Sequence, residues 1–442
     1  MFARISRIGL GLAGLLALSG CAWNGRQSTF DAKGPIAQVQ LDLFMVTVWV
    51  SLFLFITVGG ALVWAVWKFR ERPGEPVPRQ VEVGHGNPLI EIGLIAGSIL
   101  CLVIIAVPTV RAIWYTHDMP EHPGSHLASW YGNDDVAEGE EDNVLVVKAV
   151  GYQWWWSFEY PQLGGLTTAN EFVIPAGKVV RLELRSADVI HSFWLPKLAG
   201  KVDLMPGRAN WMWIQAGDTF EDWKARAAEK APEIVADKSE DSLRSAYAAY
   251  LQEDIFGHYY GQCAEYCGDS HAYMLFRTDV VSDERFAEWV REQKQAPAPP
   301  KGEDWREFMN KALSDESYVT GDPIAHGAYL YMTKGTCIQC HKIEGTPSNG
   351  MLGPNLTHVA SRKSLASGWM EHHAEDGGID REQQYANLVE WIYASETVKP
   401  GNLMYYPDNG LKNVIHPEPD SGREPLTRKD VEKIAAWLMT LR

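Results

Sequence analysis

Two long runs of apolar residues stand near the start of the chain. They extend from Leu41 to Trp67 and from Pro88 to Trp114. Each exceeds the roughly 20 residues that an α-helix needs to cross a bilayer, so the pattern predicts a transmembrane helical hairpin within residues 41–115. Neither run contains a histidine, so neither can bind a haem iron within the membrane.

The connector between these runs is positively charged. Its basic residues outnumber its acidic ones: Lys68, Arg70, Arg72 and Arg79 against Glu71, Glu75 and Glu82. Loops rich in Lys and Arg face the cytoplasm, so we expect both ends of the hairpin, and the rest of the chain, on the outer face of the membrane.

The first residues have the pattern of an export signal. Its parts are Arg4 and Arg7, the short apolar run from Ile8 to Leu18, and Leu18-Ser19-Gly20-Cys21, which is similar to a bacterial lipobox. We therefore expect a lipoprotein signal peptide over residues 1–20, lipidation of Cys21, and an outer segment over residues 21–40. The alternative is an uncleaved anchor in which Cys21 is incidental.

Short segments of alternating apolar and polar residues fill the region from about 120 to 290. The clearest are residues 143–150, 154–160, 178–185 and 211–214. Alternation with turn-forming residues between the segments predicts an antiparallel sandwich or barrel. Residues 218–253 interrupt it, because they are charged and rich in alanine and predict one or two inserted helices.

A proline-rich segment, Gln295 to Gly302, predicts a semi-rigid linker at about residues 291–304. Helical patterns follow over residues 305–442, where we expect an all-α domain. The last pattern, Thr427 to Leu441, begins with a threonine cap and sets an apolar stripe of Val431, Ile434, Ala435 and Leu438. A chain of 442 residues has room for two or three such domains.

The chain is strongly acidic, with a formal net charge of −16. This excess of acid argues against nucleic-acid binding and favours an acidic face that attracts a basic partner, such as a small cytochrome. A solvated acidic surface without a partner is the alternative, and charge alone does not choose between them.

One short segment contains four side chains that bind soft metals. It reads Cys263-Ala-Glu-Tyr-Cys267-Gly-Asp-Ser-His271-Ala-Tyr-Met274. Thiolates, imidazole and a weak thioether ligand are typical of electron-transfer copper sites. A pair of thiolates can bridge two copper ions, with His191 from upstream as a second imidazole and the carbonyl of Glu265 as a further donor. The alternatives are a disulfide or a structural zinc site.

This run resembles the binuclear copper (CuA) loop of subunit II of cytochrome c oxidase, and residues 259–263 and 205–208 resemble that family's flanking segments. The resemblance covers about residues 40–290 and implies a cupredoxin-like β-sandwich. It implies the following roles: Cys263 and Cys267 bridge both coppers, His191, His271 and Met274 are terminal ligands, and Glu265 supplies its carbonyl. The carboxylate of Glu265, by the same resemblance, joins a magnesium or manganese ion shared with subunit I.

Two further positions match residues with roles in that family. Trp154 matches the ring that receives the electron from cytochrome c, although Tyr152 and Trp155 depart from the family's usual residues. Glu91, at the cytoplasmic start of the second apolar run, matches a glutamate at the mouth of a proton pathway. The alternative for Glu91 is an acid that complements the dipole of a helix N-terminus.

Residues 337–341, Cys-Ile-Gln-Cys-His, form a Cys-x-x-Cys-His motif for covalent haem attachment. Cys337 and Cys340 would form the thioethers, and His341 would be the proximal iron ligand. The alternatives are a thioredoxin-like pair or half of a zinc site.

Met404, on an extended loop before the final helix, is the candidate for the sixth iron ligand. Here the sequence resembles class I cytochrome c, although Tyr405 stands where proline is common. Weaker candidates are Met351, Met370 and His358. Gly353 to Leu356 resembles the segment that lines the haem edge, which favours packing roles for Met351 and His358. A Met/His pair raises the iron potential, which suits delivery of electrons to copper.

All six cysteines are then assigned, to lipid (Cys21), copper (Cys263, Cys267), haem (Cys337, Cys340) and the second apolar run (Cys101). None is left for a disulfide. His117, His122 and His126 specify no ligand geometry and indicate a surface loop, and His258 fits no ligand position.

Together these features resemble subunit II of a caa-type haem–copper oxidase, with a cytochrome c fused at the C-terminus. Electrons from a soluble cytochrome c or a quinol:cytochrome c reductase would reach the fused haem, then the copper pair, then subunit I, which reduces oxygen to water with proton pumping. Tethering replaces a diffusional encounter with an intramolecular one. The implied partners are subunit I, subunit III and membrane lipid, with the multi-pass chain in a bacterial plasma membrane and its C-terminal domains outside.

Two alternatives stay open. One is the electron-delivering subunit of a CuA-containing nitric oxide reductase, and the other is a free-standing membrane-bound electron carrier. A quinol oxidase subunit is disfavoured, because that branch lacks the copper ligands present here. The chain alone cannot reduce oxygen, because it lacks intramembrane histidines.

Overall fold

The structure is a computed structural model that describes residues 25–70, 74, 86–119, 144–217, 220–236, 238–250, 258–374, 378–405, 410–419, 421–422 and 424–442. The expected signal peptide, Cys21, His122 and His126 lie outside these residues. The chain divides into two compact units, one of Met1–Gly34 with Val136–Arg442 and the other of Pro35–Asp135.

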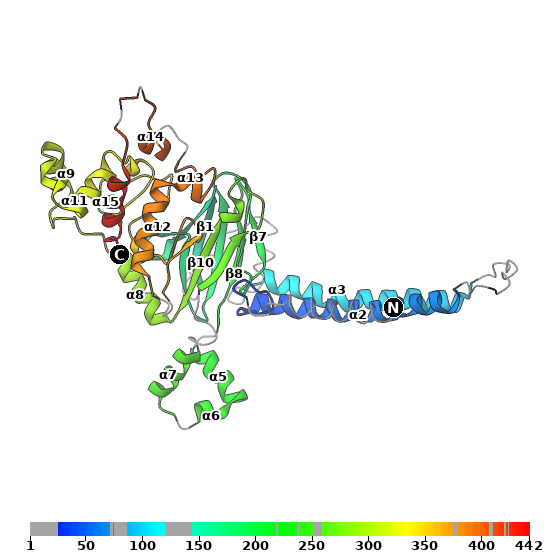
Figure 1. The fold of residues 1–442 in the computed structure, drawn as a ribbon. Helices are drawn as coiled ribbons and strands as arrows, with labels where there is room; N and C mark the ends of the chain where they lie inside the picture. The colour runs from blue at the N-terminus through cyan, green and yellow to red at the C-terminus, as the bar shows by residue number, and fades with distance from the viewer. Residues whose placement is uncertain are drawn as a thin grey trace. The chain divides into compact units, whose positions relative to one another are not determined.

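The second unit is a pair of long apolar helices, α2 (Pro35–Lys68) and α3 (Pro88–His117), which lie side by side (Figure 1). Asn87 caps α3 by accepting a hydrogen bond from the Leu89 N–H, and Pro88 takes the first helical position, where no N–H is needed. Both helices are long and apolar enough to cross a membrane. The two helices predicted from the apolar runs are confirmed, and α2 begins earlier than predicted.

The larger unit contains a β-sandwich of two five-stranded sheets, with strand orders β3-β2-β1-β5-β8 and β4-β10-β9-β6-β7 (Figure 1). The strands are β1 (Val144–Tyr152), β2 (Trp155–Tyr160), β3 (Leu166–Ala169), β4 (Glu171–Pro175), β5 (Val179–Ser186), β6 (His191–Trp194), β7 (Lys201–Leu204), β8 (Asn210–Ile214), β9 (His258–Cys263) and β10 (Leu275–Val281). All four predicted strands are present. The prediction of a purely antiparallel sheet is wrong, since β1 pairs with β5, and β10 with β4, in parallel.

Aromatic rings fill the space between the sheets. The fully buried rings of Trp156, Phe193 and Phe276 pack edge-to-face or stacked, with centroids 4.4–5.8 Å apart. Such pairs add to the free energy gained by burying large apolar surfaces. These rings belong to β2, β6 and β10, so the core ties together strands of both sheets.

Between β8 and β9, residues 220–236 and 238–250 are described and form three helices: α5 (Phe220–Lys230), α6 (Pro232–Val235) and α7 (Glu240–Tyr250). The sequence predicted one or two here. They have a small apolar cluster of their own, in which Trp223 and Leu243 are buried. After β10, Ser282 caps α8 (Asp283–Gln293), and the proline-rich segment follows.

The C-terminal region is helical. Its helices are α9 (Trp305–Ser314), α10 (Ser317–Thr320), α11 (Pro323–Met332), α12 (Arg381–Tyr393), α13 (Ser395–Val398), α14 (Leu411–Ile415) and α15 (Arg428–Leu438). Two-residue strands β11 (Ser364–Leu365) and β12 (Met370–Glu371) are a small departure from the predicted all-α domain. Thr427 caps α15 in a capping box with Asp430, and the predicted apolar stripe of α15 is buried. The predicted fold class, a helix pair, a cupredoxin-like β-sandwich and a helical C-terminal region, is confirmed.

Candidate metal centre

Strand pairing brings the two separated parts of the predicted copper site together. His191 is the first residue of β6, Cys263 is the last residue of β9, and Phe193 of β6 pairs with Cys263. The loop from β9 to β10 closes at its base, because the Cys263 N–H donates to the Met274 carbonyl at 2.9 Å. The adjacent strands therefore hold His191 beside the loop.

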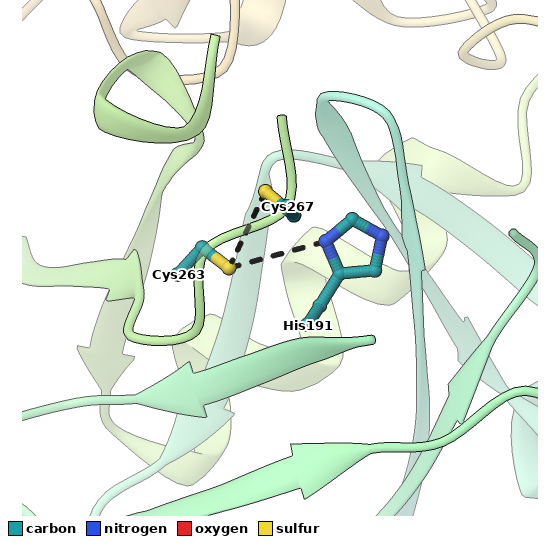
Figure 2. Close-up of side chains that lie close together, drawn as sticks. All are labelled: His191, Cys263 and Cys267. Carbon is teal, nitrogen blue, oxygen red and sulfur yellow. Dashed lines mark hydrogen bonds between the residues drawn. The ribbon is translucent and has the colours of Figure 1, made fainter. Parts of the chain in front are cut away.

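Two thiols and one imidazole form the centre of the cluster. The sulfur atoms of Cys263 and Cys267 lie 3.8 Å apart, and Sγ of Cys263 lies 3.9 Å from Nδ1 of His191 (Figure 2). The ligand atoms of these three buried residues all lie within 4.8 Å of one another. Both cysteines are free, and their sulfur atoms are too far apart for a disulfide, in which the distance is about 2 Å.

The other predicted donors face the same cluster. Sγ of Cys267 lies 3.5 Å from Nδ1 of His271 and 3.8 Å from Sδ of Met274. The carbonyl oxygen of Glu265 lies 3.2 Å from Sγ of Cys263. Each thiol thus has its own imidazole, and all six predicted donors converge. Structural zinc sites use thiolate, imidazole and carboxylate, whereas the thioether favours copper, so the donor set fits a CuA site.

Asp188 orients the imidazole of His191. Its Oδ1 lies 2.8 Å from Nε2, which leaves Nδ1 directed at Cys263. Burial disfavours the protonated form of His191, but hydrogen bonds with Asp188 and Cys263 outweigh burial and raise its pKa. Carboxylates that hold the far nitrogen of a ligating histidine fix its tautomer and raise its basicity. Sequence reasoning missed Asp188, and only its position three residues before His191 could have indicated it.

The two thiols differ in their readiness to ionise. A hydrogen bond from the Cys267 thiol, opposed by burial and helped by His191, lowers the pKa of Cys263 to about 4. The same hydrogen bond, together with burial, raises the pKa of Cys267. The pair therefore favours a thiolate at Cys263, and a bound metal would displace the remaining thiol proton.

Trp154 lies directly against the ligand loop. Its indole Nε1 donates to the carbonyl of Cys267 at 2.9 Å, and Nε2 of Gln153 donates to the same oxygen at 2.7 Å. The predicted strand began at Trp154, but this residue lies in the turn before β2. From this turn the ring reaches the loop that carries Cys267, whereas on a strand it would project from one face of the sheet.

The Cys-x-x-Cys-His motif forms a short turn, with a 3₁₀-helix over Cys337–Gln339. Both cysteines are free, and Nδ1 of His341 lies 2.8 Å from the carbonyl of Pro354, which leaves Nε2 available. A Cβ at Gly353 would lie 2.7 Å from Cε1 of this ring, so only glycine allows the backbone this close. Burial lowers the pKa of His341, which favours the neutral imidazole that binds iron. These features fit a covalently attached haem.

The candidates for the sixth iron ligand have different surroundings. Met404 is partly buried and packs against the helical core. His358 has both ring nitrogens within hydrogen-bond distance of carbonyls, those of Arg442 at 2.8 Å and Gln293 at 3.0 Å, so it serves packing. Met370 lies in β12, and Met351 is 75% exposed beside the motif.

The remaining predicted positions lie apart from these clusters. Glu265 is exposed to solvent. Glu91 lies in the first turn of α3, where an acid complements the helix dipole. Cys101 lies within α3, His117 is the last residue of α3, and His258 begins β9.

Curated relatives of this chain are named subunit 2 of cytochrome c oxidase or, at lower identity, of quinol oxidase. The model of the periplasmic domain of cytochrome c oxidase subunit II matches residues 162–220. Cytochrome c oxidase subunit 2 of Alkalihalophilus pseudofirmus is 28% identical over 97% of this chain and 94% of that protein. A protein of Rickettsia bellii named "Probable cytochrome c oxidase subunit 2" is 31% identical over 57% of this chain and 77% of that protein. The crystal structure of the periplasmic domain of subunit II of cytochrome oxidase from Bradyrhizobium japonicum is 33% identical, with a TM-score of 0.25, over 34% of this chain and 93% of that one.

Proposed function

The chain belongs to the cytochrome c oxidase subunit II family, and from this premise we propose that it delivers electrons to the oxygen-reducing subunit I of a haem–copper oxidase. The observation that carries the proposal is the convergence of two thiols, two imidazoles, a thioether and a carbonyl at the end of the β-sandwich. The family and this donor set support a CuA-type centre. The chain therefore works as part of an oxidoreductase complex.

In this proposal Cys263, Cys267, His191, His271 and Met274 would hold the copper pair with their side chains, and Glu265 would contribute its carbonyl. A copper pair held there would supply a centre that accepts and releases one electron at a time. The chain's own contribution is rigidity. Asp188 fixes the ring of His191, the Cys263–Met274 hydrogen bond closes the loop, and the three sulfur-bearing residues are buried.

We further propose that the helical C-terminal region holds a haem c, attached through Cys337 and Cys340 and ligated by His341 and Met404. The motif spacing and the free Nε2 of His341 support this. The match to the Alkalihalophilus pseudofirmus protein covers 97% of the chain, so it must extend through most of this region. The region would receive electrons from a soluble cytochrome c or a quinol:cytochrome c reductase, and Trp154 would lie on the way to the ligand loop.

Other parts of the proposal concern the membrane and the partner subunits. α2 and α3 would span a bacterial plasma membrane twice, with the sandwich and the helical region outside and Cys21 lipidated after removal of residues 1–20. The exposed carboxylate of Glu265 would complete a magnesium or manganese site with subunit I. Glu91 would lie at the mouth of a proton pathway that serves pumping, and subunit III would complete the complex.

Metal analysis of the purified complex tests this function. The wild-type complex should contain a copper pair and a covalent haem for each copy of this chain, and it should consume oxygen with reduced cytochrome c. Cys263→Ser should remove the copper pair and abolish oxygen uptake while keeping the haem. Cys101→Ala, which changes a cysteine of α3 outside the cluster, is the matched control and should behave as wild type. Wild-type complex that consumes nitric oxide but not oxygen would refute the proposed substrate.

A further inference from the structure

A buried lysine joins the helical C-terminal region to the sandwich beside the copper-ligand loop. Lys399 lies just after α13 and is 3% exposed. Its Nζ donates to the carbonyl of Trp154, to the carbonyl of Tyr273 at 3.0 Å and to Oγ of Ser367 at 2.8 Å. Trp154 and Tyr273 belong to the sandwich, so one ammonium group holds two of its backbone segments.

Ser367 reinforces the same contact. Its Oγ donates to the carbonyl of Trp154 at 2.7 Å, and its own carbonyl accepts from the Leu275 N–H at 3.1 Å. The Trp154 carbonyl therefore receives donors from two segments of the helical region. Tyr273 and Leu275 flank Met274, the thioether of the copper cluster, so this contact reaches both sides of one proposed ligand.

The loop that carries Met404 begins at Lys399 and lies on the Trp154 ring. Gly401 has φ +75°, and a Cβ there would lie 3.1 Å from Cη2 of Trp154, so a larger residue would be both strained and crowded. Oγ of Ser270 donates to the Pro400 carbonyl, and Asn402 closes the loop by donating to the Lys399 carbonyl at 2.8 Å. The proposed haem-ligand loop and the ring beside Cys267 are thus in direct contact.

A buried ammonium group such as that of Lys399 is unusual in a purely structural contact. Burying an ammonium group has a large free-energy cost unless hydrogen bonds replace water, and here the oxygen atoms of Trp154, Tyr273, Ser367 and, at 3.4 Å, Ala366 do so. Burial nevertheless lowers the pKa of Lys399 to about 7. An apolar side chain would fill the space at a lower cost, so the amine of Lys399 is best explained by the specific geometry that its hydrogen bonds impose.

We propose that Lys399 is a positioning residue for electron transfer: through the carbonyls of Trp154 and Tyr273 it holds the Met404 loop against Trp154 and the ligand loop. The effect on electron transfer rests on the proposed function, but the contact itself is made by the protein chain and needs neither copper nor haem. Electron transfer from a docked donor domain is fast only while the contact persists. Loss of the Lys399 hydrogen bonds should therefore slow electron transfer without changing the haem or the copper centre.

Lys399→Met tests the proposal, because it keeps the length of the side chain and removes the ammonium. The matched control is Lys363→Met, a partly exposed lysine of the same interface whose Nζ lies 3.3 Å from Asp279. In the purified complex, laser-flash photoreduction would give the rate of intramolecular transfer from the haem to the copper pair. We expect Lys399→Met to lower that rate about tenfold or more, the factor for one lost charge-assisted hydrogen bond, and Lys363→Met to leave it unchanged.

Two further readouts separate positioning from folding. The visible spectra and midpoint potentials of both centres should stay as in wild type in Lys399→Met. Hydrogen exchange of the backbone in residues 364–372 and 399–405 should become faster, a readout that needs neither copper nor haem. Ser367→Ala, which removes the weaker donor to Trp154, should show smaller changes of the same kind if Lys399→Met fails to fold.

Different results would overturn the positioning role of Lys399 and the proposed function. An unchanged transfer rate in Lys399→Met, or a slower rate accompanied by a changed copper spectrum or potential, would overturn the positioning role. If the wild-type complex took up no haem, the proposed function would fail, and hydrogen exchange alone would decide whether Lys399 holds this contact. Equal exchange rates in Lys399→Met and wild type would then refute it.

Discussion

The indole Nε1 of Trp154 donates a hydrogen bond to the backbone carbonyl of Cys267 at 2.9 Å. Cys267 is one of the two clustered thiols, so this bond connects the aromatic ring to the proposed copper site through a single residue. The other side of Trp154 contacts the loop from Lys399 to Met404. Trp154 therefore lies between the two regions that the proposal assigns to copper and haem.

Trp154→Phe should slow electron transfer while leaving the copper pair in place. The substitution removes the hydrogen bond to Cys267 but keeps an aromatic ring, and Gln153 still donates to the same carbonyl. The expected loss of stability is about 1 kcal/mol, as for one hydrogen bond. The rate of electron transfer is measured from the change in the copper absorbance during reduction in a stopped-flow experiment. Trp155→Phe is the control, because Trp155 stacks on Tyr152, and equal rates in the two variants would contradict the role of Trp154.

Asp188→Asn should weaken copper binding without removing any ligand. The carboxylate holds Nε2 of His191, and loss of such a partner typically reduces metal affinity by about 10–100-fold. Competition with a copper chelator measures the affinity of the purified protein. Asp203→Asn changes an exposed carboxylate on the neighbouring strand β7 and serves as the control. The interpretation of Asp188 would be wrong if both variants bound copper as tightly as wild type.

The interface between the sandwich and the helical region should weaken in acid. Burial disfavours ionisation of Glu371, but hydrogen bonds from Arg277, at 2.7 Å, and from Arg26 outweigh it and lower the pKa of Glu371 below its ordinary value of 4.5. A lowered carboxyl pKa stabilises the folded state above about pH 4.5, and this stabilisation is lost as the pH falls through the folded pKa. Thermal unfolding of wild type should therefore shift to lower temperature below that pH.

Glu371→Gln should lose part of this dependence on pH, because its side chain does not titrate. At neutral pH it should be less stable than wild type by roughly 2 kcal/mol, the contribution of a hydrogen bond to a charged group. Identical acid profiles of the two proteins would show that Glu371 is not the titrating group.

Met404→His should lower the midpoint potential of the haem. Methionine as an axial ligand raises the potential relative to histidine, and axial ligands set haem potentials over a range of about 0.8 V. We expect a decrease on the order of 0.1 V in a redox titration of the haem absorbance. Met351→Leu, at an exposed position, should leave the potential unchanged. The reverse pattern would assign the iron ligand to Met351.

The sequence predicted the clustered donors better than their surroundings. Five of the proposed donors, Cys263, Glu265, Cys267, His271 and Met274, stand within one run, and His191 was expected from the need for a second imidazole, so all six were predicted without a structure. Asp188 and Gln153 were not predicted, because their contacts with His191 and Cys267 exist only after folding. Lys399 was not predicted for the same reason. It donates to the backbone carbonyls of Tyr273 and Trp154, which both lie more than 120 positions away along the chain.

The fold shows the same division. Long apolar runs predicted α2 and α3, and the threonine cap predicted α15, because these signals are local. Strands β6 and β7 have four residues each, which is too short for alternation to be recognised. The parallel pairing of β1 with β5 depends on how segments far apart in the chain meet, and periodicity carries no information on strand direction.

Electron paramagnetic resonance of the oxidised complex, combined with metal quantitation, tests the central claim most directly. Two copper ions bridged by Cys263 and Cys267 should share one unpaired electron, so the spectrum should show hyperfine coupling to two equivalent copper nuclei, and Cys263→Ser should abolish it. A spectrum of isolated copper, a single zinc ion bound in its place, or a disulfide between Cys263 and Cys267 in the matured protein would contradict the account.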